Sequence, residues 1–108
     1  MAEALPATAV VRVSRGTFDP GRFAEVDAVT AKTAEYLVPA IKALPGLIHY
    51  YAAVSPEGSV VHVSVWDSAD HAAQMSGLRE MAVVARGEME AIGVTFTPIV
   101  NYPVSWTI

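Results

Sequence analysis

The stretch LPGLIHYYAAVSPEGSVVHVSVWDSADH, from Leu44 to His71, decides the fold of this chain. Two runs rich in β-branched and aromatic residues, 47–54 and 59–66, flank the tetrapeptide Ser55-Pro56-Glu57-Gly58. Proline and glycine at these positions are typical of a turn, so the two runs predict an antiparallel hairpin. The acidic and small residues 67–70 come directly after the second run and predict the start of a helix.

Helical and extended patterns on either side of this hairpin predict the remaining elements. Residues 8–15 are β-branched and predict a first strand. Asp19-Pro20 predicts a helix start, and apolar residues then recur at alternating three- and four-residue spacing as far as Leu44. Pro39 predicts a kink in that helix, and Pro45-Gly46 predicts its end. A second helical pattern covers 68–92. Gly77 and Gly87 weaken it, which predicts a break near Gly77, and Gly93 predicts its end.

The last fifteen residues, 94–108, alternate between apolar and polar side chains and predict a final strand. One face of it would be formed by Val94, Phe96, Pro98, Val100, Tyr102, Val104, Trp106 and Ile108. Pro98 and Pro103 lack the N–H of a strand ladder, so this strand should be bent or lie partly at an edge. Its apolar face is longer than one small sheet needs, and we interpret it as a dimerisation element.

The element order is therefore β-α-β-β-α-β, which predicts an α+β, ferredoxin-like fold. Both helices would cover one face of a four-stranded antiparallel sheet. The strands are apolar on both faces, which favours cover on both sides. We therefore expect a homodimer that packs sheet to sheet into an α+β barrel, with residues 1–7 as a short tail and 8–108 as the single domain.

Composition excludes several classes of function. The 108 residues fit one domain, and only 17% are charged against 53% hydrophobic, which again favours a partner subunit. The net charge is −4 and the seven Lys and Arg residues are scattered, which argues against nucleic acid and against anionic membranes. The chain has no cysteine, no signal-peptide pattern and no apolar run of membrane-spanning length. We expect a cytoplasmic protein.

The chain resembles the antibiotic-biosynthesis-monooxygenase-like group of the dimeric α+β barrel superfamily. The resemblance covers residues 8–108 and depends on Leu44-Pro45-Gly46, on the strand VHVSVW that ends in Trp66, and on the run 67–70. It implies a ligand pocket between the sheet and the helices of each subunit, with Trp66 as a wall. It also implies a small-molecule-binding protein similar to cofactor-independent monooxygenases that act on phenolic or polyketide-like aromatics. The alternative is a non-catalytic homodimeric ligand-binding or stress-associated module.

Departures from the family patterns narrow this expectation. Haem-degrading relatives carry an Asn on the first strand and a haem-ligating His at the position of Ser76, and this chain has neither. His71 comes a full helical turn too early for that role, so the resemblance disfavours haem degradation. In the cofactor-free oxygenases an Asn stands at the position of His62. We therefore expect no cofactor and no metal.

Alternation along the strand 59–66 separates two faces. Val60, His62, Ser64 and Trp66 share the polar and aromatic face, which is typical of a pocket floor, and three valines share the other. A hairpin with a three-residue loop and a bulge places Ile48, Tyr50 and Ala52 beside Trp66, Ser64 and His62. A shift by one residue would place His49 and Tyr51 there instead. We prefer the first register.

The candidate catalytic residue is His62, as a general base or as a donor to a substrate oxygen. The competing interpretation is a buried neutral histidine with a satisfied hydrogen bond. Tyr50, Ser64 and Trp66 are candidate pocket residues, against ordinary core roles. Tyr36 and His71 are weaker candidates for the pocket or its rim. Asp67 and Asp70 are explained by helix capping rather than by a metal site.

Overall fold

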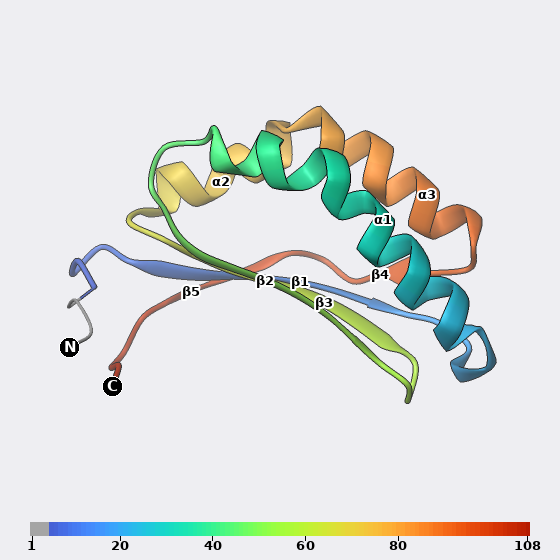
Figure 1. Cartoon of the computed structure of the whole chain (residues 1–108). Helices are drawn as coiled ribbons and strands as arrows, with labels where there is room; N and C mark the ends of the chain where they lie inside the picture. The colour runs from blue at the N-terminus through green and yellow to red at the C-terminus, as the bar shows by residue number, and fades with distance from the viewer. Residues whose placement is uncertain (1–4) are drawn as a thin grey trace.

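The sheet of the computed structural model, which describes residues 5–108, has the strand order β2-β3-β1-β4, with β5 also paired to β1 (Figure 1). The strands are β1 (Val10–Thr17), β2 (Leu47–Ser55), β3 (Ser59–Trp66), β4 (Thr95–Phe96) and β5 (Val100–Pro103). All pairings are antiparallel. Because β4 and β5 are two parts of one final strand, the predicted β-α-β-β-α-β fold is confirmed. Residues 1–4 of the predicted tail lie outside the described residues.

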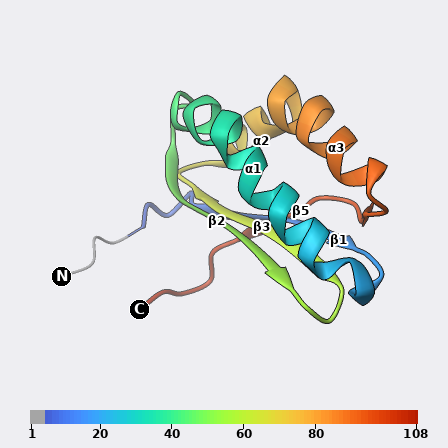
Figure 2. The same ribbon diagram turned by 45° about the vertical axis from the view of Figure 1, so that its right-hand side comes forward.

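The helices cover only one face of this sheet, as Figures 1 and 2 both show. They are the 3-10 turn η1 (Pro20–Arg22), α1 (Phe23–Lys42), α2 (Ala69–Gly77), the π-helical segment η2 (Glu80–Ala85) and α3 (Arg86–Ala91). The opposite face of the sheet is uncovered in this single chain and carries Val61, Val63 and Val65 on β3. The predicted homodimer would bury that face, and it stays a prediction.

The first helix begins and ends close to its predicted limits. Asp19 caps η1, where its Oδ1 accepts a hydrogen bond from the N–H of Gly21 at 2.9 Å. Pro39 lies inside α1, which continues as far as Lys42. The turn into β2 then needs Gly46, whose φ of 87° lies in the left-handed region that favours glycine.

The second helical region is broken where the sequence predicts weakness. The helix α2 ends at Gly77, and Leu78 follows with an extended backbone (φ −79°, ψ 109°). The chain then enters η2, a wider π-helical turn, before α3. Isolated π-helical turns are frequent at functional sites. The break separates α2 from α3 above the sheet, and the cavity described below is lined from both sides of it.

The preferred hairpin register is confirmed over most of its length. Tyr50 pairs with Ser64 and Ala52 pairs with His62. At the start of β2 the prediction is wrong, because Leu47 and not Ile48 pairs with Trp66. A bulge between Leu47 and His49 adds one unpaired residue there. The bulge leaves the positions of Tyr50 and Ala52 unchanged.

The predicted fifteen-residue final strand is wrong in length and in its faces. Gly16 pairs with Phe96, whereas Val13 pairs with Val100, so two residues of β1 face three residues of the segment 97–99. The extra residue falls around Pro98, which has no N–H to donate. Since paired residues share a face, Phe96 faces the helices but Val100 faces away from them with Val13. In the sequence the adjacent apolar residues Ile99 and Val100 interrupt the alternation here, but Phe96, Pro98, Val100 and Tyr102 keep a two-residue spacing that hides the reversal.

The core lies between the helices and the covered face of the sheet, in two clusters. One surrounds Trp66 and the other surrounds Val60. The fully buried members of the first are Trp66 on β3 and Ala72 and Met75 on α2. The second holds Val26 and Met89 between α1 and α3. His62 lies on β3 between Val60 and Trp66, at the gap between the two clusters.

Candidate functional site

A cavity of about 180 Å³ lies between the covered face of the sheet and the helices. Its sheet side is formed by β1 and β3 and carries the polar groups Arg12, Ser14 and His62. Thr30 and Thr33 line it from α1. Its remaining walls are largely apolar and include Leu37, Met75, Met81, Met89 and Phe96. This combination of apolar walls with a few convergent polar groups is typical of a ligand site.

A second hollow of about 330 Å³ adjoins the first along α1 and β2. It is mostly apolar, and Leu37, Ile41 and Leu47 are among its lining residues. Four residues line both spaces: Thr30, Thr33, Leu37 and His62. His62 therefore stands at the junction of the two spaces, and Tyr50 lines the second.

Tyr50 and His62 form a hydrogen-bonded pair on the floor of this site. The phenol oxygen Oη of Tyr50 lies 2.6 Å from Nδ1 of His62, and the rings meet edge to face. Burial raises the pKa of Tyr50, so the phenol is neutral. Burial, with a contribution from the Arg12 guanidinium, lowers the pKa of His62 to about 4. The imidazole is therefore neutral at pH 7, and its Nε2 is the nitrogen left for a ligand.

Arg12 is the site residue that the sequence reasoning missed. It pairs with Ser64 on β3, and its side chain lies on the covered face of the sheet with only 5% exposure. Its Nη2 makes one long contact, 3.5 Å, to Oγ of Ser76 on α2. Burial lowers its pKa, and the nearby Tyr50 opposes that change. The signal was present in the strand alternation, which places residue 12 on the same face as the buried Val10.

The pair Ser64 and Trp66 belongs to the core in this structure. The indole Nε1 of Trp66 donates to Oγ of Ser64 at 2.8 Å, and both side chains are buried. Neither residue lines the two spaces described above. Trp66 packs instead with Met75 and Ala72 beneath α2. Trp66 can therefore affect the cavity only through neighbours such as Met75, which does line it.

Tyr36 lies outside the cavity as well. Its hydroxyl donates to Oε1 of Glu88 at 3.1 Å and so joins α1 to α3. Partial burial and then the Glu88 carboxylate raise the pKa of Tyr36 to about 12. The geometry gives this residue a helix-joining contact beside the site.

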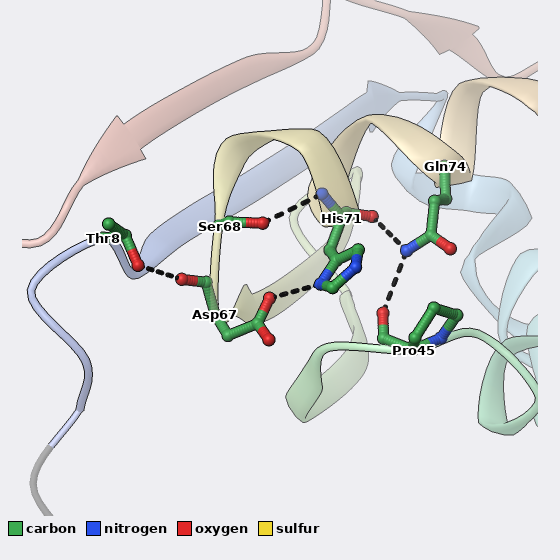
Figure 3. Close-up of polar contacts among 6 residues, drawn as sticks. All are labelled: Thr8, Pro45, Asp67, Ser68, His71 and Gln74. Carbon is green, nitrogen blue, oxygen red and sulfur yellow. Dashed lines mark hydrogen bonds and ion pairs between the residues drawn. The ribbon is translucent and has the colours of Figure 1, made fainter.

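His71 belongs to a separate polar cluster at the start of α2 (Figure 3). Its Nδ1 lies 2.6 Å from Oδ1 of Asp67, and its backbone N–H donates to the capping Ser68. Gln74 donates to the carbonyl of Pro45 at 2.9 Å, so the cluster ties the loop before β2 to α2. Within residues 5–108, three metal-binding side chains of the His, Cys, Asp or Glu type do not gather anywhere. The residues Asp67–His71 therefore have a structural role, because they help to hold the loop before β2 against the start of α2.

Comparison with solved structures identifies the fold. SnoaB, a cofactor-independent oxygenase from Streptomyces nogalater, superposes with a TM-score of 0.67 and is 21% identical, over 94% of this chain and 98% of its own. ActVA-Orf6, a monooxygenase from Streptomyces coelicolor in complex with nanaomycin D, gives a TM-score of 0.71 at 17% identity, over 94% and 92% of the two chains. This chain has the antibiotic-biosynthesis-monooxygenase-like fold. A protein of unknown function from Nitrosomonas europaea shares it, with a TM-score of 0.71 and 13% identity over 94% of both chains.

The comparisons by sequence do not assign the chain to a family. No family model matches the chain, and no curated protein matches it. The similarity to antibiotic-biosynthesis-monooxygenase-like proteins is therefore one of fold, and the residues of the cavity must supply the argument about function. Within residues 5–108, every helix is too short or too polar to cross a bilayer.

Proposed function

We propose that the protein is a small-molecule-binding, cofactor-independent oxygenase that acts on a phenolic or polyketide-like aromatic compound. One observation carries the proposal: the cavity holds a neutral imidazole, a buried guanidinium and apolar walls, in a fold shared with oxygenases. Two solved structures of that fold support it, since one is a cofactor-independent oxygenase and the other holds nanaomycin D.

The size and lining of the cavity support an aromatic ligand. A closed apolar cavity of about 150 Å³ accommodates benzene. The space of about 180 Å³ beside His62 therefore suits one ring, and the adjoining space of about 330 Å³ suits further fused rings. The helical segments α2, η2 and α3 contribute mostly apolar lining residues, among them Met75, Met81 and Met89, with Ser76 and Arg86 as the polar exceptions.

The geometry favours His62 as a hydrogen-bond donor over His62 as a base. A pKa of about 4 makes the imidazole a weak proton acceptor at neutral pH. When Tyr50 donates to Nδ1, Nε2 carries the remaining proton and can donate it to a substrate oxygen. This donation would help to stabilise negative charge on that oxygen in a site with little water.

The proposed overall reaction needs only molecular oxygen as oxidant. The substrate anion is electron-rich at the ring carbon that becomes oxidised. That carbon forms a bond to one oxygen atom of O₂, and the other oxygen atom leaves as water with two hydrogens of the substrate. The product is a quinone. The protein's own residues hold the ring, exclude water and stabilise the anion.

Oxygen consumption with a hydroxyanthrone such as dithranol tests the proposal. We expect His62→Ala to reduce the rate above the uncatalysed background by about a hundredfold, since a positioned donor to a developing oxyanion contributes on that order. His49→Ala is the matched control, because His49 is exposed and lies on the uncovered face. Trp66→Phe should reduce the rate less, through displaced neighbours. Unchanged turnover of oxidisable aromatics in both His62→Ala and Trp66→Phe would sink the proposal.

A non-catalytic ligand-binding module is the second candidate. It is favoured by the satisfied hydrogen bonds of the predicted site residues, because Tyr50 pairs with His62 and Trp66 pairs with Ser64. On this alternative, isothermal titration would show binding of the aromatic compound while an oxygen electrode showed no consumption above background. The two measurements on one protein sample separate the candidates.

We further propose that the protein is a homodimer joined through the uncovered face of the sheet. That face carries Val61, Val63 and Val65, and the exposed aromatic side chains of Tyr51 and Tyr102 lie on it. A contiguous apolar surface of this kind is typical of a protein interface. In a two-fold symmetric dimer, each subunit would use this same face to cover the uncovered face of the other.

A further inference from the structure

The guanidinium of Arg12 is buried without an acidic partner within residues 5–108. Within that range the close contacts between basic and acidic side chains join Arg22 to Glu25, His71 to Asp67, and Arg86 to Glu90. Arg12, at 5% exposure, has only the 3.5 Å contact to the hydroxyl of Ser76. Burying a cation is costly unless an opposite charge or strong hydrogen bonds compensate. The other guanidinium nitrogens of Arg12 donate to no protein acceptor within residues 5–108, and because no fully buried nitrogen there lacks a partner, they reach accessible space.

The surroundings of Arg12 carry no negative charge. The lining of the cavity includes Arg12 and Arg86 and no Asp or Glu. Arg86 is already engaged, since it pairs with Glu90 and its guanidinium lies 5.4 Å from the ring centre of Phe96. The hydroxyls of Thr30, Thr33 and Thr97 donate to backbone carbonyls. Arg12 is thus the cavity's buried, uncompensated charge.

We propose that Arg12 recognises an anionic oxygen on the aromatic ligand of this cavity, and that it selects the ionised form of that ligand. The inference rests on the proposed function, because it names the chemical class of the compound bound at the same site. His62 and Arg12 line the same cavity from neighbouring strands, so a single ring oxygen there would meet an N–H donor and a fixed positive charge. The ligand class is an acidic phenol or enol, or an aromatic carboxylate.

Binding the ligand as its anion would favour the proposed reaction with O₂. An aromatic anion gives up electron density to O₂ more readily than the neutral phenol does. A guanidinium stays protonated under all conditions in which the protein is folded, so it can lower the pKa of a bound phenol without itself titrating. Arg12 would then supply the electrostatic stabilisation, and His62 the directional hydrogen bond.

Three matched probes test the inference: 4-nitrophenol, whose anion is visible by absorbance, 4-nitrobenzoate, and the neutral 4-nitroanisole. We expect the wild-type protein to bind the two anions at least about tenfold more tightly than 4-nitroanisole, and to lower the pKa of bound 4-nitrophenol. The tighter of the two anions identifies the ligand as a phenol or a carboxylate. In Arg12→Met the preference should disappear while 4-nitroanisole binds as before.

Arg15→Met is the control variant, because Arg15 lies on the same strand but is exposed and on the opposite face. It should keep the anion preference. Arg12→Gln replaces Arg12→Met if the latter does not fold. Equal binding of anions and 4-nitroanisole by the wild-type protein, or an unchanged preference in Arg12→Met, overturns the role of Arg12 and leaves the proposed function standing. Failure of the folded wild-type protein to bind any of the three probes removes the proposed ligand site itself.

Discussion

The hydroxyl of Tyr50 and the ring nitrogen Nδ1 of His62 lie 2.6 Å apart, and the contact joins strands β2 and β3 on the face that the helices cover. The pairing Tyr50 with Ser64 and Ala52 with His62 places the two rings diagonally across the strand pair. Because of this contact, Nδ1 of His62 is hydrogen-bonded within the protein and Nε2 is not. Protonation of His62 therefore affects the free energy of unfolding as well as the chemistry of the site.

Stability should fall as the pH falls from about 6.5 to about 4. The pKa of His62 is about 4 in the folded chain against an ordinary value of 6.5, so the unfolded chain binds this proton first. The stabilisation is fully present above pH 6.5 and is lost as the pH drops through 4. Its full size is about 3 kcal/mol, since one pKa unit corresponds to about 1.4 kcal/mol.

Urea unfolding at pH 7.5 and pH 4.5, at one protein concentration, checks this. His62→Gln should show a smaller acid loss than the wild-type protein, while His49→Gln, on the sheet face opposite His62 and away from the cavity, should retain the wild-type loss. The neighbouring Arg12 and Tyr50 keep their ionisation state over this range, so they do not make the free energy of unfolding depend on pH. An equal acid loss in wild-type and His62→Gln proteins would contradict the burial of a neutral imidazole.

Ser64→Ala should destabilise the protein by about 1–3 kcal/mol. The change leaves the buried indole N–H of Trp66 without the acceptor that lies 2.8 Å away. Chemical denaturation followed by tryptophan fluorescence measures the loss. Ser105→Ala changes an exposed serine and should leave the free energy of unfolding within about 0.5 kcal/mol of the wild-type value. A neutral Ser64→Ala would mean that the indole N–H has another partner.

Gly46→Ala should be severely destabilising, by more than about 2 kcal/mol. A Cβ atom there would come within 2.5 Å of Asp67 Oδ1 and closer still to Nδ1 of His71, and the φ of +87° would strain any side chain. Gly87→Ala is the opposite case, since nothing lies within 4 Å of its Cβ position and it lies in α3. It should stabilise by about 0.5–1 kcal/mol. Thermal denaturation of both variants checks the contrast, and equal effects would refute the close contacts at Gly46.

Val63→Asp should convert the proposed homodimer to a monomer. Val63 lies at the middle of β3 on the uncovered face, where it pairs with Val13 and Tyr51. A carboxylate there would be buried without a partner in a sheet-to-sheet interface. Sedimentation velocity gives the mass of each variant in solution. Val83→Asp, on the exposed side of η2, is the control and should stay dimeric. A wild-type monomer at micromolar concentration would rule out the dimer.

Much of this fold could be predicted because its signals are local. The hairpin 47–66 has alternating faces and a proline-glycine turn, and the helix start at Asp19 has a capping residue and a proline. The broken helix at Gly77 was visible for the same reason. The exception is the segment around Pro98, where the extra residue is defined only by pairing with β1.

The candidate site was predicted less completely, for physical reasons. His62 and Tyr50 line the described spaces, because strand alternation assigns faces reliably. Trp66 lies in the core instead, because Ala72 and Met75 of the following helix pack against it, and this tertiary contact cannot be derived from strand alternation. Arg12 escaped notice because a buried charge opposes the general rule that arginine is exposed. Only the assembled sheet brings it to the cavity that His62 also lines.

The single additional residue between Phe96 and Val100 decides which face of the sheet the side chains of β5 occupy. It reverses the direction in which every following side chain points, so Val100 and Tyr102 are presented to the outside rather than to the helices. Deleting Pro98 would turn Val100 and Tyr102 toward the helices without changing any other residue. The length of one short connection thus governs whether the same aromatic residue is available to a neighbouring molecule or to the interior.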